Sequence, residues 1–193
     1  MPRNADSTRQ KLQQAALELF TERGYERTTA TDIAEASGVT ERTFFRHFAD
    51  KRDVLFTPQI EFEKPFVEAV AASPNSDPRS LIEAAALAGA EAFLGKRRDW
   101  SRARHLLLNS EARLRERELT KLADLSASLT SAFVDRGVDA PVAAIGAEIA
   151  TTTFRLAHSR WTQIDDTRSL IDIQHEVLAD LDRALTQSTP TSS

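Results

Sequence analysis

The sequence predicts an all-α protein, with a three-helix helix-turn-helix at the N-terminus and a larger helical part after it. Apolar residues recur at helical spacing along most of the chain, only 6 of 193 residues are glycine, and no Asn-Gly or Asp-Gly hairpin pair separates alternating segments. A chain of this length buries about 70% of its unfolded surface, so it needs no disulfides. It contains no cysteine. We expect about nine helices.

The net charge of −4 is unevenly distributed along the chain. An acidic protein is an unusual partner for nucleic acid, but the first 58 residues hold nine basic and nine acidic side chains, so the excess acidity belongs to the remainder. The N-terminus has no apolar signal region, and no run approaches the roughly 18 apolar residues of a membrane span. We therefore expect a cytoplasmic protein with no membrane partner.

Three short helices are predicted near the N-terminus. The first has an apolar stripe at i, i+3, i+4, i+7 and i+8, formed by Leu12, Ala15, Ala16, Leu19 and Phe20. Thr29 followed by Asp32 predicts a capping box for a second helix over residues 30–37. Thr40 is the expected N-cap of the third. Two short helices joined by a brief turn containing Gly38 predict a helix-turn-helix, whose second helix can enter a DNA major groove.

The third helix is predicted to have two unlike faces. Phe44 and Phe48, at i and i+4, form its buried side. The opposite side presents basic and small polar side chains, with an aromatic ring and an imidazole at its edges: Arg42, Thr43, Arg46, Phe45 and His47. Arginine can donate two hydrogen bonds to guanine, and threonine can contact a thymine methyl or a phosphate. For His47, a place in the small core and a role as phosphate donor are equally open.

The rest of the chain is predicted to be helical. Asp50 is the expected cap of a helix that Pro58 and Pro65 kink or interrupt. Lys51 would lie just inside it, where the helix's positive end also favours a phosphate. Further helices are expected over residues 79–94, 99–109, 111–136, 141–161 and 166–186.

The segment Thr8 to Phe56 resembles the DNA-binding domain of the TetR family of bacterial transcriptional regulators. The motifs "LFTERGY", "DIAEASGV", "TFFRHF" and "DK" follow in the family's order and spacing. The resemblance implies a ligand-responsive regulator, usually a repressor, that binds a palindromic operator in double-stranded DNA as a homodimer and is released by a small molecule. It implies base or groove contacts from Thr31, Glu41, Arg42, Thr43, Phe45 and Arg46, and phosphate contacts from Thr29, Thr40, His47 and Lys51. Phe45 stands where the family often has tyrosine, so a phenol hydrogen bond cannot be made there.

The resemblance also predicts the domain organisation. We expect a DNA-binding domain over residues 1–55, a regulatory and dimerisation domain over 56–187, and a disordered tail over 188–193. The last two long helices, 142–161 and 170–185, carry more apolar surface than one amphipathic face requires, which favours a homodimer, with a buried intramolecular bundle as the alternative. Arg3, Arg9 and Lys11 form either an arm that approaches DNA or a disordered terminus.

A pocket in the C-terminal part is predicted from large aromatic or polar residues on otherwise apolar helices. The candidates are Phe62, Phe66, Phe93, Trp100, His105, Leu108, Phe154, His158 and Trp161. Each has plain core as its alternative, and the last three also fit a dimer seam. The effector is expected to be apolar or amphipathic. The segment "RLRERELTKL" resembles TetR-type regulators of which some sense acyl-CoA thioesters, but a solvated helix face explains it better.

Two other function classes were considered. The four histidines have no metal-binding spacing, and neither a phosphate-binding glycine loop nor a nucleophile elbow occurs, so no catalytic residue, metal or cofactor is predicted. A helical protein-interaction or small-molecule-binding protein without specific DNA binding is the alternative. It leaves the capped third helix and its outward Arg-Thr-Arg surface unexplained.

Overall fold

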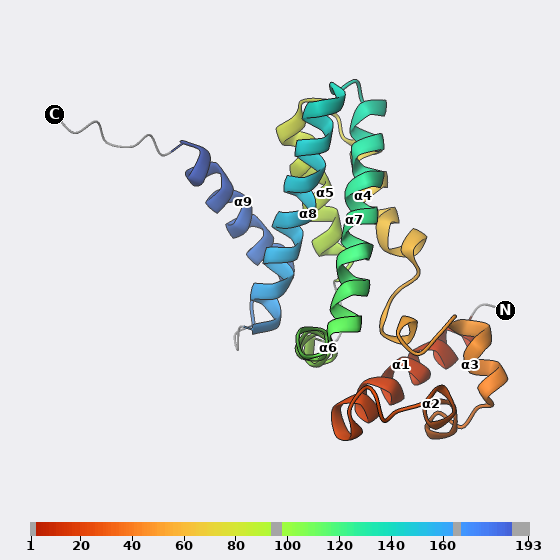
Figure 1. Ribbon diagram of the computed structural model, residues 1–193. Coiled ribbons are helices and arrows are strands. Elements are labelled where there is room, and N and C mark those ends of the chain that lie inside the picture. The colour runs from red at the N-terminus through yellow and green to blue at the C-terminus, as the bar shows by residue number, and fades with distance from the viewer. Residues whose placement is uncertain (1–2, 94–97, 164–166, 187–193) are drawn as a thin grey trace. The chain divides into compact units, whose positions relative to one another are not determined.

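The computed structural model describes residues 3–93, 98–163 and 167–186, and all regular structure in these ranges is helical (Figure 1). The elements are α1 (Arg3–Arg23), α2 (Ala30–Ala36), α3 (Glu41–His47), the 3-10 helix η1 (Asp53–Leu55), α4 (Gln59–Ala72), α5 (Pro78–Glu91), α6 (Arg98–Ser110), α7 (Ala112–Asp135), α8 (Ala140–Gln163) and α9 (Leu170–Thr186). The predicted all-α fold is confirmed. No helix in the described ranges is both long and apolar enough to cross a membrane.

The chain divides into two compact units. The N-terminal unit consists of residues 1–59 together with 99–120, and the C-terminal unit of residues 60–98 together with 121–193. The N-terminal unit therefore contains most of α6 and the start of α7, in addition to the residues predicted for the DNA-binding domain. Leu107, Leu108 and Leu114 are buried in its core, which explains why that distant segment belongs to it. The predicted tail over 188–193 lies outside the described residues.

The N-terminal unit is built around one apolar core. The predicted stripe of α1 is buried, and α2 packs against both α1 and α3. Phe20, Tyr25, Ile33 and Phe44 are buried together in this core. Burial raises the pKa of the Tyr25 phenol to about 12, so it remains protonated.

The prediction of a helix beginning at Asp50 was wrong. Asp50 accepts hydrogen bonds from the backbone N–H groups of Arg52 and Asp53, and the chain forms a turn and the short helix η1. Helix α4 begins only at Gln59, directly after Pro58. Proline disfavours the helical conformation of the residue before it, so a helix that started at Asp50 would end there. Pro65 lies inside α4.

The C-terminal unit is a helical bundle in which α5, α8 and α9 pack against one another. Its core includes Phe66, Phe133 and Phe154. Arg79 on α5 forms an ion pair with Asp182 on α9, at 2.7 Å. Asp77 caps α5 ahead of Pro78. Helix α9 begins at Leu170, and its predicted start at residue 166 lies outside the described residues.

Gly89 provides a direct test of packing in this unit. A Cβ atom there would lie 2.2 Å from Phe66 Cε1 and 3.1 Å from Phe154 Cδ2, so the Phe66 ring contacts the helix backbone itself. We expect Gly89→Ala to lower the unfolding free energy by about 1–3 kcal/mol, although alanine is the better helix former. Urea denaturation measures this loss.

Phe66→Leu is the matched background for this substitution, because a smaller side chain leaves room for the new methyl group. In that background the cost of Gly89→Ala should fall below its cost in the wild-type protein. An equal cost in both backgrounds would contradict the proposed clash.

Candidate nucleic-acid interface

Both short helices of the helix-turn-helix are capped by their own threonines. The Thr29 hydroxyl accepts a hydrogen bond from the Asp32 backbone N–H at 3.1 Å, and the Thr29 N–H donates to Asp32 Oδ2 at 2.7 Å. The Thr40 hydroxyl accepts from the Thr43 N–H at 3.2 Å. The predicted capping box and N-cap are confirmed. The connecting turn contains Gly38 at φ +68°, a conformation that favours glycine.

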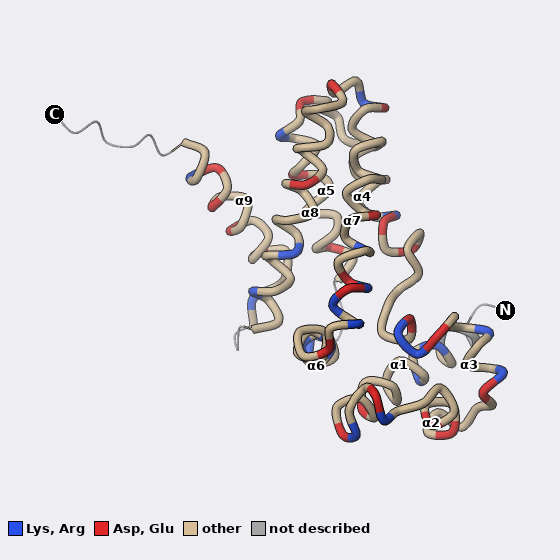
Figure 2. Tube along the Cα trace, in the orientation of Figure 1, with Lys and Arg blue, Asp and Glu red and all other residues tan. Residues whose placement is uncertain are grey.

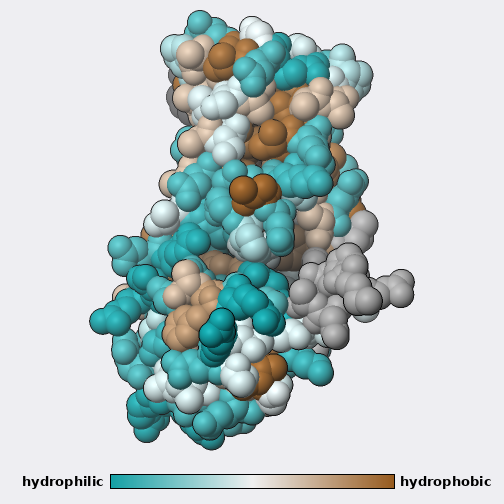
Figure 3. All heavy atoms as spheres, turned by 90° about the vertical axis from the view of Figure 1, so that its right-hand side faces the viewer, coloured by the Kyte–Doolittle hydropathy of each residue, from teal (hydrophilic) through white to brown (hydrophobic). Residues whose placement is uncertain are grey.

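The two faces of α3 are divided as predicted. Phe44 is 0% exposed and Phe48 is also buried, whereas the Phe45 side chain next to them is 50% exposed. Arg42 and Arg46 are exposed as well. Figure 2 marks acidic and basic positions along α3, and in Figure 3 the visible face of the N-terminal unit is mostly hydrophilic, with small separate apolar areas. Phe45 is thus an exposed aromatic residue that lies in the sequence between two exposed arginines.

The remaining predicted contact residues also lie on the surface of the helix-turn-helix. Thr43 is half-buried. The exposed residues of this group are Thr29, Thr31, Thr40 and Glu41. They lie at the start of α2 and at the start of α3, and α3 also carries the two arginines.

Arg9 holds the end of α3 in place. Its guanidinium donates from Nη1 to the His47 carbonyl at 3.3 Å and from Nη2 to the Phe56 carbonyl at 3.0 Å. It also lies 4.5 Å from the centroid of the Phe48 ring. A cation suits the carbonyl end of a helix, so Arg9 both satisfies and stabilises the end of α3. Sequence reasoning considered Arg9 only as part of an arm or a disordered terminus.

His47 is half-buried at the end of α3. Its pKa lies below the ordinary value, first because of burial and then because of the positive charges of Arg46 and Arg9. The imidazole is therefore neutral at physiological pH. Its Nε2 atom is buried and has no hydrogen-bond partner in the described part of the chain.

Lys51 has a different place from the one predicted. It lies in the turn before η1 rather than inside α4. Its Nζ donates to the carbonyls of Tyr25 at 2.8 Å and Thr28 at 3.1 Å, and lies 4.2 Å from the Tyr25 ring centroid. An ammonium group has three donors, so this arrangement leaves one for a phosphate. Lys51 thus ties the turn before η1 to the segment between α1 and α2.

Comparison with known proteins agrees with this geometry. The family model for "Bacterial regulatory proteins, tetR family" matches residues 12–56, which include α2 and α3. The HTH-type transcriptional regulator TcmR of Streptomyces glaucescens is 44% identical over 93 residues, which is 48% of this chain. The helix-turn-helix segment is thus similar to the DNA-binding part of TetR-family regulators. The match spans about two fifths (39%) of the TcmR chain.

Two solved structures are similar to this chain over nearly its whole length. Thermus thermophilus FadR, a TetR-family repressor in complex with lauroyl-CoA, is 25% identical, with a TM-score of 0.54 and coverage of 96% of this chain and 99% of that one. A TetR-family regulator from Syntrophomonas wolfei is 20% identical, with a TM-score of 0.62 and coverage of 97% and 99%. The second likeness shows the fold alone.

Six of the nine candidate pocket residues come together in the C-terminal unit. Their rings form a continuous series of contacts through Phe62, Phe66, Phe154, Phe93, His158 and Trp161. Lys121 on α7 is only 3% exposed, and its Nζ lies 4.1 Å from the Phe62 ring centroid. Sequence reasoning missed Lys121, because a lysine in a charged helix gives no sign of burial.

The other three candidates lie in the N-terminal unit. Leu108 is buried in the core of that unit, and Trp100 packs against the same core. His105 is half-buried, with its Nε2 atom 3.0 Å from the Asn109 amide. Burial lowers the pKa of His105, with a further contribution from Arg104. These three residues therefore belong to a different compact unit from the aromatic series.

The cap of α2 predicts how stability changes with pH. Hydrogen bonds from Thr29 lower the pKa of the Asp32 carboxyl. The carboxylate therefore stabilises the fold above its unfolded pKa of about 3.9, and this contribution is lost as the pH falls through the lower native value. Thr29→Ala should cost about 1 kcal/mol at neutral pH. It should also make the acid-side loss of stability less steep.

Urea denaturation of the wild-type protein and the variant from neutral pH down to about pH 3 measures both effects. Thr31→Ala is the control, because Thr31 is exposed on the same helix and caps nothing. If Thr29→Ala and Thr31→Ala lose stability equally steeply on acidification, the capping box does not set the pKa of Asp32.

Proposed function

We propose that this protein is a homodimeric transcriptional regulator that binds a palindromic DNA operator through α3. It acts as a repressor and is released when a small molecule binds in the C-terminal unit. The observation that carries the proposal is the outward face of α3, where Arg42, Phe45 and Arg46 are exposed while Phe44 and Phe48 anchor the helix from behind.

The exposed residues suit distinct tasks in a major groove. Arg42 and Arg46 can each donate two hydrogen bonds to a guanine, and Phe45 can pack against a thymine methyl. Thr31, Glu41 and Thr43 complete the proposed base-contacting surface. Thr29, Thr40 and His47 are proposed to contact phosphates, and Lys51 has one ammonium donor left for such a contact.

An apolar stripe on α8 supports the dimer. Val142, Ile145 and Leu156 are exposed on one side of this helix, Ile145 by 62%, and Ile149 lies between them. Large exposed aliphatic side chains at helical spacing favour a protein–protein contact. We propose that α8 and α9 pair with their counterparts in a second copy, as a closed twofold interface.

The proposed effector is apolar or amphipathic. Support comes from the ring series that runs from Phe62 to Trp161, with the buried ammonium of Lys121 at the Phe62 end. Aromatic surface with a few polar groups is typical of small-molecule sites. Thermus thermophilus FadR is in complex with lauroyl-CoA, which makes acyl-CoA thioesters the first class to test. The TetR family is not an enzyme class, and the proposal assigns no catalytic residue. We also propose that the protein acts in the cytoplasm.

The function is tested with the DNA upstream of the protein's own gene. The purified protein should bind a palindrome there more tightly than random DNA of equal length at physiological salt. The logarithm of the affinity should fall with the logarithm of salt concentration, by about 0.9 per phosphate neutralised. The proposal is refuted if the protein binds the palindrome and the random DNA with equal affinity both in the absence and in the presence of cell extract.

Arg42→Ala tests direct readout. We expect it to relax the base preference at one operator position, with a cost of about 1–3 kcal/mol on the preferred sequence if the contact is bidentate. Fluorescence anisotropy with operators that vary at each position measures the effect. Arg113→Ala is the control for charge, because Arg113 is exposed on α7 in the same unit. An equal loss on all sequences would assign Arg42 to the DNA backbone instead.

A further inference from the structure

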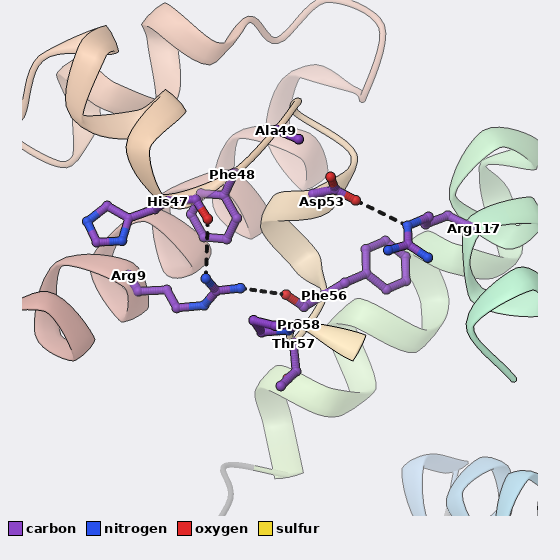
Figure 4. Close-up of a pocket in the computed structure, with 9 residues that line it drawn as sticks. All are labelled: Arg9, His47, Phe48, Ala49, Asp53, Phe56, Thr57, Pro58 and Arg117. Atoms are coloured by element: carbon purple, nitrogen blue, oxygen red, sulfur yellow. Dashed lines mark hydrogen bonds and ion pairs between the residues drawn. The ribbon is translucent and has the colours of Figure 1, made fainter. Parts of the chain in front are cut away.

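A small pocket lies in the N-terminal unit, behind the end of α3 (Figure 4). Its volume is about 180 Å³, and its lining residues are Arg9, His47, Phe48, Ala49, Asp53, Phe56, Thr57, Pro58 and Arg117. This volume is several times the roughly 30 Å³ that one water molecule occupies in the liquid. The pocket is therefore large enough for a small polyatomic ligand.

Arg117 supplies a directed donor group to this pocket. Its Nε donates to Asp53 Oδ1 at 3.1 Å, which fixes the plane of the guanidinium. The two terminal nitrogens, Nη1 and Nη2, have no hydrogen-bond partner among the described residues. The guanidinium carbon lies 5.6 Å from the Phe56 ring centroid, and the side chain is 30% exposed. A guanidinium held in this way presents two parallel N–H donors, which match the spacing of two oxygens on one oxyanion.

The charges around the pocket favour an anion. Two guanidiniums, of Arg9 and Arg117, face one carboxylate, of Asp53, and Figure 4 shows Arg117 on the opposite side of the pocket from Arg9 and His47. The positive charge of Arg9 also helps to lower the pKa of His47. The imidazole thus lies in a positive field that a bound anion would reduce.

We propose that this pocket binds a small oxyanion, a phosphate group, with the terminal nitrogens of Arg117 as its donors and Arg9 as the second positive charge. The assignment goes beyond the proposed function, because His47 is the one residue proposed to contact DNA that also lines the pocket, and no residue of the aromatic series lines it. A bound phosphate would join α7 to the segment that directly follows α3, since Ala49, Thr57 and Pro58 line the same space.

Two sources of phosphate are chemically equivalent here, a free phosphate or phosphorylated small molecule and the backbone of DNA. We assign the pocket to the free anion, because its lining comes from the end of α3, η1, the 56–58 segment and α7. None of the exposed residues proposed to read bases, Arg42, Phe45 or Arg46, contributes to it.

The test is thermal unfolding of the full-length protein in inorganic phosphate, compared with sodium chloride at equal ionic strength. Phosphate at several times its dissociation constant should raise the wild-type melting temperature by about 2–4 °C. Arg117→Met should abolish this phosphate-specific rise. The control Arg113→Met removes an equally charged, exposed side chain from the same helix and should retain it.

Asp53→Asn gives the opposite expectation and controls for general disruption. It removes the one negative charge in the lining but leaves an amide oxygen that can still accept from Arg117 Nε, so the dissociation constant for phosphate should fall several-fold. The phosphate-dependent rise is measured within each variant, so a lower starting stability does not confuse the comparison. If Arg117→Met and Asp53→Asn both abolish the rise, the assignment of Arg117 as the donor is wrong.

The remaining outcomes separate the two sources. No phosphate-specific rise in the wild-type protein, or an equal loss in Arg113→Met, would overturn the proposal. If phosphate has no effect but Arg117→Met weakens binding to DNA of every sequence and lowers the salt dependence, the pocket belongs to the DNA backbone and the free-anion assignment is wrong. The unfolding measurement uses no DNA, so its result stands apart from that of the operator experiment.

Discussion

The N-terminal unit depends on the packing of the Phe44 ring in its apolar core. Helix α3 has only seven residues, and a helix of that length does not persist alone in water. Its position is set by Phe44, which is fully buried in the core shared with α1 and α2, and by the contacts at the two ends of the helix. Thr40 satisfies the first turn, and Arg9 satisfies the last carbonyl. The buried face and the two ends of α3 make the contacts that position the helix. The side chains on its exposed face are therefore free of structural tasks and can contact a partner.

The basic residues of this unit consequently have different tasks. Arg9 and Lys51 donate to backbone carbonyls and lie over aromatic rings, so their main role is to connect α1, the segment after it and the end of α3. Arg42 and Arg46 are exposed. The net charge of the unit does not distinguish the structural basic residues from the exposed ones. A basic side chain stabilises the fold at one position, and at another it is exposed and can bind a partner.

The parts of this arrangement that the sequence predicted are local. Caps at Thr29 and Thr40, and the division of α3 into a buried and an exposed face, depend on residues within a few positions of one another. One failure involves distant parts of the chain. Leu107 and Leu114 pack in the same core as residues that lie dozens of positions earlier in the sequence. The spacing of apolar residues within a helix does not show which distant segment the helix packs against. Lys51 was misplaced for a local reason, because the helix was predicted to begin at Asp50, whereas α4 begins only at Gln59, directly after Pro58.

The account predicts that DNA contacts α3 and the start of α2 directly. Hydrogen–deuterium exchange of the protein with and without its upstream palindrome measures this residue by residue. Slower exchange should be concentrated in residues 29–47, with little change in α5 of the C-terminal core. Unchanged exchange over residues 41–47 in the presence of saturating, specifically bound DNA would contradict the account, because the outward face of α3 would then not be the surface that binds.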